Sequence, residues 1–390
     1  MPTISIVIPV YNVEEYLEES LNSVLNQTFD DFEVICVDDG STDNSLEILN
    51  YFKNRDSRIK VIAQKNKGNG GARNTGLKHA TGDYVYFMDS DDILFENAIE
   101  KMYNNIIRNN SDLVIFKIAW LKDGEPLSYA PQVFPFDDVF TNKNFNDFTF
   151  TYKDVKYYLM NYGTFAIWAK FYKKEFLDKY KEYLIFPEHT AFGDVRFHVA
   201  SLILASKISF EDDFLYQYRL SNQNSITNNN SNRMDIFNVV NSVEDFLKEI
   251  KKYEELKDEF IQFKIHQYLH HMSSANSTEF FQKVREEFLK INIDEFSIKS
   301  HFKGRYELLI DSDNYNDYLH DLILYDEKKN DKYKIISNNK ELLKLKKENK
   351  QLKKKNKKLN KEMEKYKKLN SEMKSSKSWR ITKPLRKLKG

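Results

Sequence analysis

Three carboxylates follow directly on an apolar segment in the first quarter of the chain. Residues 84–88 are aromatic, β-branched or aliphatic, which is typical of a buried strand, and Asp89, Asp91 and Asp92 come immediately after it. Like charges so close together repel one another, and hard oxygen ligands of this kind favour a divalent cation such as Mg²⁺ or Mn²⁺. The alternative is an acidic turn that caps the helix expected from about Phe95, since Asp and Ser are common N-cap residues.

Other apolar segments predict the sheet to which this strand would belong. Residues 4–10, 32–37 and 59–63 have the composition of buried strands, and the second of them ends in Asp38 and Asp39. Amphipathic segments between them predict helices. Strands that alternate with helices indicate an α/β fold with a mainly parallel sheet flanked by helices. Ligands of such sheets bind at the carboxyl ends of the strands, where these carboxylates would gather.

Glycines at positions 68, 70 and 71 form an expected flexible loop before a helix over residues 72–80. The dinucleotide fingerprint does not fit, because Arg73 stands where a third glycine is required and the loop follows the third strand. A P-loop does not fit either, because no Gly-Lys-Ser/Thr closes the run. We expect the glycines to allow close backbone approach, while Arg73 binds an anion near the helix N-terminus. The alternative is an ordinary surface arginine.

Four motifs occur in order along the first 120 residues, at positions 5–12, 37–43, 71–77 and 87–92. In sequence and spacing they resemble the family 2 glycosyltransferases. The resemblance implies a GT-A fold, in which a nucleotide-binding half is joined to an acceptor-binding half. It also implies transfer of a sugar from a nucleotide sugar with inversion of configuration.

The resemblance implies roles for individual residues as well. Arg73 would contact the base or the diphosphate, Asp89 would lie beside the ribose, and Asp91 would hold a metal that bridges the diphosphate. Arg219, in a segment similar to the family's closing segment, would reach the diphosphate. The residues that would line the nucleoside pocket are Pro9, Tyr11, Asn12, Asp39 and Asn66.

These roles are chemically reasonable. Departure of a nucleoside diphosphate develops negative charge, which a divalent cation and an arginine neutralise. A carboxylate such as Asp39, placed after a buried strand, can accept the imide N–H of uracil. This favours UDP-sugars as donors, with GDP- and dTDP-sugars as the alternatives.

One carboxylate is the expected general base. Residues 167–172 and 192–198 also resemble the family, in which a Glu-Asp pair supplies the base, but Gly193 stands here in place of the glutamate. We expect Asp194 to take the proton of the acceptor hydroxyl as the diphosphate leaves on the opposite side. The alternative is that Asp194 caps a helix over residues 195–205.

Beyond this domain the chain changes character. A helical region over residues 231–330 has no recognised motif, and its His266, His270 and His271 are expected on a solvated helix face rather than around a metal. The expected parts are a GT-A domain at 1–230, with its nucleotide-binding half at about 1–120 and its acceptor half at about 121–230, the helical region at 231–330, a coiled-coil-like helix at 335–376 and a basic amphipathic tail at 377–390.

The formal charge of +1 conceals a strong asymmetry. Residues 341–390 contain 20 Lys or Arg against five Glu, a net of +15, while the preceding residues carry a net of −14. Leucines spaced by seven from Leu345 indicate a dimeric coiled coil, and a solitary charged helix is the alternative. The last 14 residues mix cations with Trp379 and Leu385, which suits an anionic membrane surface.

The single cysteine, Cys36, excludes an intrachain disulfide and is typical of the reducing cytosol. No apolar run is long enough to span a bilayer, and we expect a cytoplasmic protein that is peripheral on the inner face of the cell membrane. The predicted function is transfer from a nucleotide sugar to a glycan or lipid-linked acceptor in cell-surface polysaccharide synthesis. The alternatives are an inactive GT-A scaffold and a nucleic-acid-binding protein, but the acidic body has no groove-reading motif and no nucleic acid is expected.

Overall fold

The computed structural model describes residues 1–122, 125, 127–129, 140, 148–155, 160, 166–222, 233–275 and 277–326. The chain forms two compact units, Met1–Tyr315 and Asn316–Gly390. In the second unit, residues 316–326 are described and are helical. The predicted coiled coil at 335–376 and the basic tail at 377–390 lie outside the described residues, and the predicted division at residue 230 stays a prediction.

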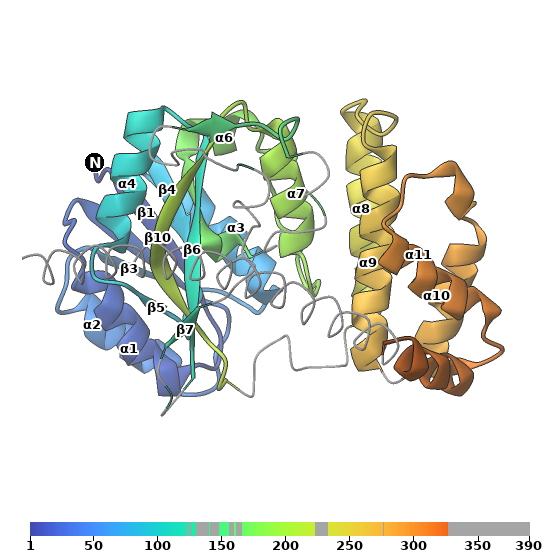
Figure 1. Ribbon diagram of the computed structural model, residues 1–390. Coiled ribbons are helices and arrows are strands. Elements are labelled where there is room, and N and C mark those ends of the chain that lie inside the picture. The colour runs from blue at the N-terminus through green and yellow to red at the C-terminus, as the bar shows by residue number, and fades with distance from the viewer. Residues whose placement is uncertain are drawn as a thin grey trace, which may run out of the picture. The chain divides into compact units, whose positions relative to one another are not determined.

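A mixed sheet organises the first unit (Figure 1), and its strands run in the order β3-β2-β1-β4-β9-β6-β10-β5. Neighbours among β1 to β4 are parallel, and so are β6 and β10, whereas β9 is antiparallel to β4 and β6 and β5 is antiparallel to β10. Short strands β7 and β8 add to β6 and β10. The strands are β1 Ile4–Val10, β2 Phe32–Asp38, β3 Ile59–Ala63, β4 Tyr84–Phe87, β5 Ile93–Leu94, β6 Leu113–Leu121, β7 Ser128–Tyr129, β8 Thr149–Phe150, β9 Lys170–Lys173 and β10 Ile208–Arg219.

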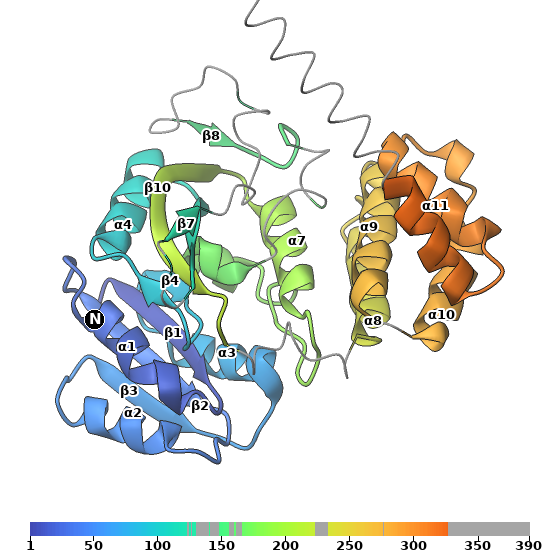
Figure 2. The same cartoon turned by 60° about the horizontal axis from the view of Figure 1, so that its bottom comes forward.

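Helices cover both faces of the sheet, which confirms the predicted α/β class (Figure 2). One face packs against α1, α2 and α4 in a single apolar core. The other packs against α3, where Gly76 lies so close to Val7 that a Cβ would come within 2.3 Å of a Val7 methyl. The helices of this part are α1 Glu14–Leu25, α2 Ser45–Lys53, α3 Gly68–His79, α4 Ala98–Asn109, α6 Lys174–Lys179 and α7 Asp194–Leu204.

The predicted glycine loop is wrong, because its glycines form the first turn of α3, which begins at Gly68. Glycine is a poor helix former, but packing overrides propensity here. A Cβ at Gly70 would lie 2.4 Å from the carbonyl oxygen of Pro187. The small residues are therefore needed for close contact with a neighbouring segment, as expected, but inside a helix.

The predicted helical region is confirmed in its described residues by α8 Asp235–Glu249, α9 Lys257–Ala275, α10 Thr278–Leu289 and α11 Ser300–Asp311. The expectation of a solvated histidine face is wrong for His271, which is 6% exposed and contacts the ring of Phe192. Burial lowers the pKa of His271 to about 3. In the described part of the chain, no three His, Cys, Asp or Glu side chains are grouped to hold a metal.

A buried glutamate near the amino end of β2 joins this strand to its neighbours. Glu33 accepts hydrogen bonds from the Ser5 hydroxyl at 2.6 Å and the Thr81 amide at 2.8 Å, and its other oxygen pairs with Lys60 at 2.5 Å. Burial alone would raise its pKa, but Lys60, Ser5 and Thr81 outweigh burial and lower the pKa to about 2.

This glutamate predicts acid sensitivity. Because the pKa falls from 4.5 to about 2 on folding, the ionised carboxylate stabilises the fold above pH 4.5, and this contribution is lost between pH 4.5 and 2. We expect Glu33→Gln to lower the free energy of unfolding at pH 7 by about 2 kcal/mol. This is less than the full pKa shift would give, because Lys60 is half exposed and solvent screens its charge. Urea unfolding from pH 2 to 7 measures this. An equal pH slope in wild type and variant would contradict it, and Glu47→Gln, at an exposed position on α2, is the control.

Candidate active site

The carboxyl ends of β1, β2 and β4 bring the predicted nucleoside-pocket residues to one edge of the sheet, as their parallel pairing requires. Asp39 is 2% exposed, and its amide donates to the Val10 carbonyl at 2.8 Å. Its Oδ1 accepts from Gln64 Nε2 at 2.7 Å and from the Lys67 amide at 2.9 Å. Its Oδ2 accepts no bond within the described residues. The carboxylate is thus fixed through one oxygen and open to a ligand through the other.

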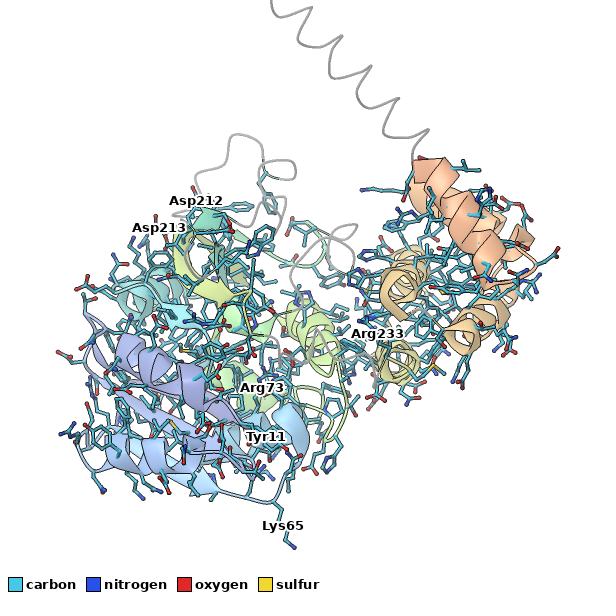
Figure 3. The ribbon with its side chains drawn as sticks, turned by 90° about the horizontal axis from the view of Figure 1, so that it is seen from below. Tyr11, Lys65, Arg73, Asp212, Asp213 and Arg233 are labelled. Carbon is cyan, nitrogen blue, oxygen red and sulfur yellow. The ribbon has the colours of Figure 1, made fainter. Side chains whose placement is uncertain are left out.

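The remaining pocket residues lie at or just after the ends of β1 and β3. Pro9 is buried within β1 and Tyr11, labelled in Figure 3, is 49% exposed. Asn12 has a left-handed backbone, with φ of 51°, and its side chain accepts from the Thr42 amide at 2.7 Å. Asn66 is exposed and accepts from the Gly68 amide. An exposed ring and a buried carboxylate on one edge could hold a planar nucleobase.

One buried arginine connects the sheet edge with α7. Arg73, from the second turn of α3, is 2% exposed. Its two terminal nitrogens each lie 2.6 Å from a carboxylate oxygen, one of Asp89 and one of Asp194. Asp89 is 16 and Asp194 is 121 positions away from Arg73 in sequence, so only the fold brings the three together. The alternative of an ordinary surface arginine is therefore excluded.

The geometry of Asp194 distinguishes between its two predicted roles, a general base and a helix cap. It is the first residue of α7, but the helix has no side-chain cap bond, and the carboxylate turns to Arg73. Burial raises the pKa of Asp194 above its ordinary value, while Arg73 opposes that rise. Oδ2 of Asp194 accepts no bond within the described residues, so one oxygen stays available to a proton donor. The capping alternative is thus contradicted.

The structure also explains the glycine that replaces the family's glutamate. A Cβ at Gly193 would lie 2.9 Å from Cγ of Pro187, closer than real Cβ atoms approach a neighbour. A longer side chain here would require the proline to move. The expected base Asp194 therefore has no acidic neighbour at position 193.

The three carboxylates after β4 have different environments. Asp92 is fully buried and accepts from the Tyr216 hydroxyl at 2.5 Å and the Arg219 amide at 2.7 Å. Burial and the neighbouring Asp91 and Asp89 raise the pKa of Asp92 well above its ordinary value. Asp92 therefore joins β10 to the acidic turn and is not available as a ligand, which the sequence pattern did not indicate.

Asp91 and Asp89 are the half-buried members of the turn. The side chain of Asn222 donates to Oδ2 of Asp91 at 2.7 Å. Burial, and then Asp89, raise the pKa of Asp91 above its ordinary value. Excess negative charge and hard oxygen donors at one edge fit a divalent cation, and Mg²⁺ or Mn²⁺ in such sites is held by one or two carboxylates with the remaining ligands from substrate phosphates and water.

Arg219 lies beside this turn but is engaged by protein groups. Its Nε donates to the Asp91 carbonyl at 2.9 Å, and one terminal nitrogen pairs with Glu19 of α1 at 2.5 Å. Contact with a diphosphate stays a prediction. Arg219 thus holds the backbone of the acidic turn through the Asp91 carbonyl.

Lys170, which the sequence marks only as part of the segment 167–172, is a buried cation near the site. It is 1% exposed at the start of β9, and its ammonium donates to the Ala166 carbonyl at 2.7 Å. Burial lowers the pKa of Lys170 to about 7, and the negative charge of Asp194 opposes this decrease. The positive charge of Lys170 in turn lowers the pKa of Asp194. Its electrostatic interaction with Asp194 follows from insertion of β9 between β4 and β6, which no local signal predicts.

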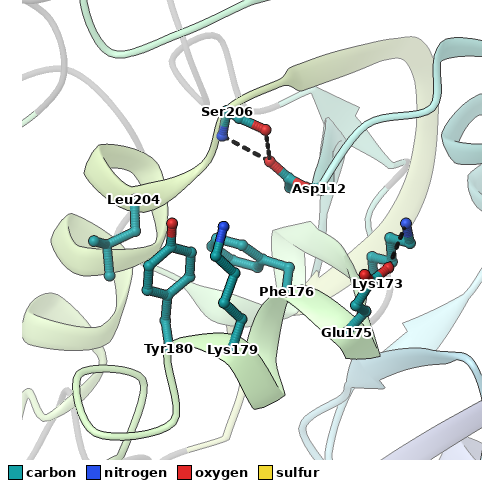
Figure 4. A pocket seen from close by; sticks show the side chains of 8 residues that line it. All are labelled: Asp112, Lys173, Glu175, Phe176, Lys179, Tyr180, Leu204 and Ser206. Carbon is teal, nitrogen blue, oxygen red and sulfur yellow. Dashed lines mark hydrogen bonds and ion pairs between the residues drawn. The ribbon is translucent and has the colours of Figure 1, made fainter.

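A small hollow of about 130 Å³ lies at the opposite edge of the sheet (Figure 4). Asp112 and Ser206 line it, and Oδ2 of Asp112 already accepts the amide and the hydroxyl of Ser206 at 2.6 Å. The hollow contains none of the predicted site residues. We assign it no role in the chemistry.

Comparison with known proteins supports the fold and the family. The profile of Glycosyl transferase family 2 matches residues 5–180. A crystal structure of Staphylococcus aureus TarS in complex with UDP is 26% identical, with a TM-score of 0.52 over 75% of this chain and 76% of that one. The TarS complex with UDP-GlcNAc is 22% identical, with a TM-score of 0.56 over 81% and 89%. The sheet order and these likenesses define a GT-A fold.

Curated relatives extend the comparison. Streptococcus pneumoniae glycosyltransferase GlyG is 35% identical over 55% of this chain and 70% of its own length. The chain belongs to the family 2 glycosyltransferases. The poly(ribitol-phosphate) beta-glucosyltransferase of Bacillus spizizenii is 37% identical over 55% of this chain and 32% of its own length, and Bacillus subtilis EpsJ is 32% identical over 58% and 63%. The match thus spans less than two thirds of these two relatives.

Proposed function

We propose that this chain is an inverting, metal-dependent glycosyltransferase that moves a sugar from a UDP-sugar to a hydroxyl of a glycan or lipid-linked acceptor in cell-surface polysaccharide synthesis. The observation that carries the proposal is the pairing of Arg73 with both Asp89 and Asp194. It places the carboxylate expected beside the ribose and the expected base around one buried guanidinium. The guanidinium would offset the charge of the departing diphosphate, while Asp194 takes up the acceptor proton on the other side of the sugar.

Each part of the reaction has a residue. The nucleoside would lie on the exposed ring of Tyr11 with its uracil imide donating to Asp39. Arg73 would offset the charge of the diphosphate as the bond between the sugar C1 and the diphosphate oxygen breaks. The acceptor oxygen bonds to C1 from the opposite face, and its proton passes to Asp194.

Asp91, with Asp89 beside it, would hold Mn²⁺ or Mg²⁺. The cation would supply charge neutralisation at the diphosphate when it is bound. Support comes from the donor set and from the raised pKa of Asp91, which burial and then Asp89 cause. A UDP donor is supported by the UDP complex of TarS and by the orientation of Asp39.

A panel of UDP-, GDP- and dTDP-sugars tests the proposal. We expect release of UDP from one UDP-sugar in the presence of Mn²⁺, and a product whose anomeric configuration is opposite to that of the donor. Retention of configuration, or turnover of GDP-sugars alone, would contradict it. An inactive scaffold would bind a nucleotide sugar without turning it over, and binding of random duplex DNA would favour the nucleic-acid alternative.

The proposed membrane partner depends on the tail, which lies outside the described residues. None of the helices in the described residues combines the length and apolarity needed to cross a bilayer. A polybasic segment gains about 1 kcal/mol per Lys or Arg near an anionic bilayer, and Trp379 and Leu385 could insert at the interface. Tethering on the inner face of the membrane would hold the enzyme in the plane of a lipid-linked acceptor. A coiled coil at 335–376, as predicted from the sequence, would form a homodimer.

The tail therefore carries its own prediction. Removal of residues 374–390 should abolish sedimentation with anionic liposomes at moderate salt, because it removes cations and Trp379 together. Hydrolysis of the free donor should be unchanged. Liposome binding that survives the truncation would show that the tail is not the anchor. A tail that only solubilises or dimerises the protein would leave the full-length chain unbound.

A further inference from the structure

The segment that leads into the expected base has an unusual backbone. Between Pro187 and Asp194, both His189 and Phe192 adopt a left-handed conformation, with φ of 52° and 60°. Residues with a Cβ rarely adopt this conformation, which persists only where surrounding contacts enforce it. We call residues 187–193 the base loop. Its geometry therefore requires partners that hold it.

Helix α3 holds one side of the base loop. The amide of His189 donates to the Lys67 carbonyl at 2.9 Å. Gly68 and Gly70 allow this approach, since a Cβ at Gly70 would lie 2.4 Å from the Pro187 carbonyl oxygen and one at Gly68 would lie 3.1 Å from the His189 nitrogen. This contact explains the glycine run, but it leaves the second half of the loop to other partners.

Helices α8 and α9, which have no assigned role, hold that second half. The amide of Ala191 donates to Oδ2 of Asp235, the first residue of α8, at 2.9 Å. The ring of Phe192 lies 4.3 Å from the ring of His271 on α9, centroid to centroid. Asp235 and His271 thus contact the two residues that stand two and three positions before the base.

Contacts of α7 itself extend the same support. The guanidinium of Arg196, two residues after the base, lies 4.2 Å from the ring centre of Phe246 on α8. It also donates to the Tyr183 carbonyl at 3.1 Å, and the Tyr183 hydroxyl donates to Glu249 of α8. The base is thus supported from α8 on both sides in sequence.

We propose that α8 and α9 set the position of Asp194, with Asp235 and His271 as positioning residues that act through the base loop. The inference rests on the proposed function and deepens it, because it gives a role in turnover to a region outside the family match at 5–180. Neither residue lies on the nucleotide edge of the sheet, so their loss should change turnover and leave donor binding intact. Displacement of a reacting group by about 1 Å can lower the rate on the order of 100-fold.

The test compares Asp235→Ala with Asp235→Asn. Alanine removes the acceptor for the Ala191 amide, whereas asparagine keeps a carbonyl oxygen there. With UDP-glucose, UDP-galactose and UDP-N-acetylglucosamine as donors and Mn²⁺ present, we expect alanine to lower kcat roughly 10- to 100-fold. KM for the donor and Kd for UDP should change less than about threefold, and asparagine should restore most of kcat. Asp245→Ala, an exposed carboxylate of the same helix, is the control.

His271→Ala and His271→Phe provide a second pair, in which phenylalanine keeps a ring against Phe192. A lower kcat with nearly unchanged KM in His271→Ala, restored by His271→Phe, supports the inference. This second pair provides the test on its own if Asp235→Ala does not fold. Unchanged kcat in both alanine variants would overturn it, and so would an equal loss of UDP affinity, which indicates general destabilisation. A wild type that turns over none of the three donors would instead contradict the proposed function.

Discussion

Replacement of Asp194 by asparagine is expected to lower kcat by about 10²- to 10⁴-fold, the usual contribution of a positioned general base. Asparagine keeps the shape of the side chain and an oxygen for Arg73, but it cannot take up the proton of the acceptor hydroxyl. The nucleoside pocket lies on other elements, so Kd for UDP should stay within a few-fold of wild type. Steady-state kinetics together with calorimetric titration of UDP measure the two effects separately.

Glu188→Gln is the matched control for this variant. Glu188 is a half-exposed carboxylate on the base loop that pairs with Lys67 at 3.4 Å. We expect its replacement to leave kcat nearly unchanged. If Asp194→Asn retains full turnover and Glu188→Gln loses it, then Glu188 is the base and the assignment made from the Arg73 pairing is wrong.

Asp91→Ala is expected to abolish metal-dependent transfer while the fold stays intact. The side chain is a half-buried carboxylate at the sheet edge whose pKa burial raises, so its removal deletes a predicted cation ligand without opening a cavity in the core. The Mn²⁺-dependent rise in activity should disappear, and the melting temperature without metal should not fall. Activity assays over a range of Mn²⁺ concentrations, with thermal unfolding alongside, measure both.

Two further substitutions separate a ligand role from a structural one. Asp92→Asn replaces the buried neighbour that binds Tyr216, and we expect it to lower stability rather than the response to Mn²⁺. Asp213→Ala removes an exposed carboxylate that pairs with Lys101. Asp213 lies away from Arg73, as Figure 3 shows. It should change neither property. Retained Mn²⁺-dependent activity in Asp91→Ala would remove Asp91 from the metal site.

Much of the nucleotide-binding half could be predicted from the sequence, because its signals are local. The predicted strands at 4–10 and 59–63 agree with β1 and β3. The strand predicted at 32–37 is one residue longer in the structure and ends at Asp38. Continuous apolar runs that end in polar residues mark buried parallel strands whatever their neighbours are. The four family motifs lie at those strand ends and in α3, so the same short segments indicated both the fold and the site.

The parts that could not be predicted depend on contacts between distant segments. Insertion of β9 between β4 and β6 makes Lys170 a buried cation near Asp194, and burial of Asp92 depends on β10, more than 120 residues later. Propensity alone also misplaced the start of α3, because only the base loop explains why glycine is required there. Likewise, the spacing of the histidines could not show that His271 packs against Phe192.

Calorimetric titration of UDP into the full-length protein, with and without Mn²⁺, tests the central claim most directly, since the claim is that the carboxyl edge of the sheet holds a nucleoside diphosphate through a cation. We predict that UDP binds with Mn²⁺ present and at least about tenfold more weakly without it, a difference of about 1.4 kcal/mol. Asp91→Ala should bind UDP equally weakly in both conditions. Binding of UDP that is independent of Mn²⁺ and of Asp91, or no binding at all, would contradict the account.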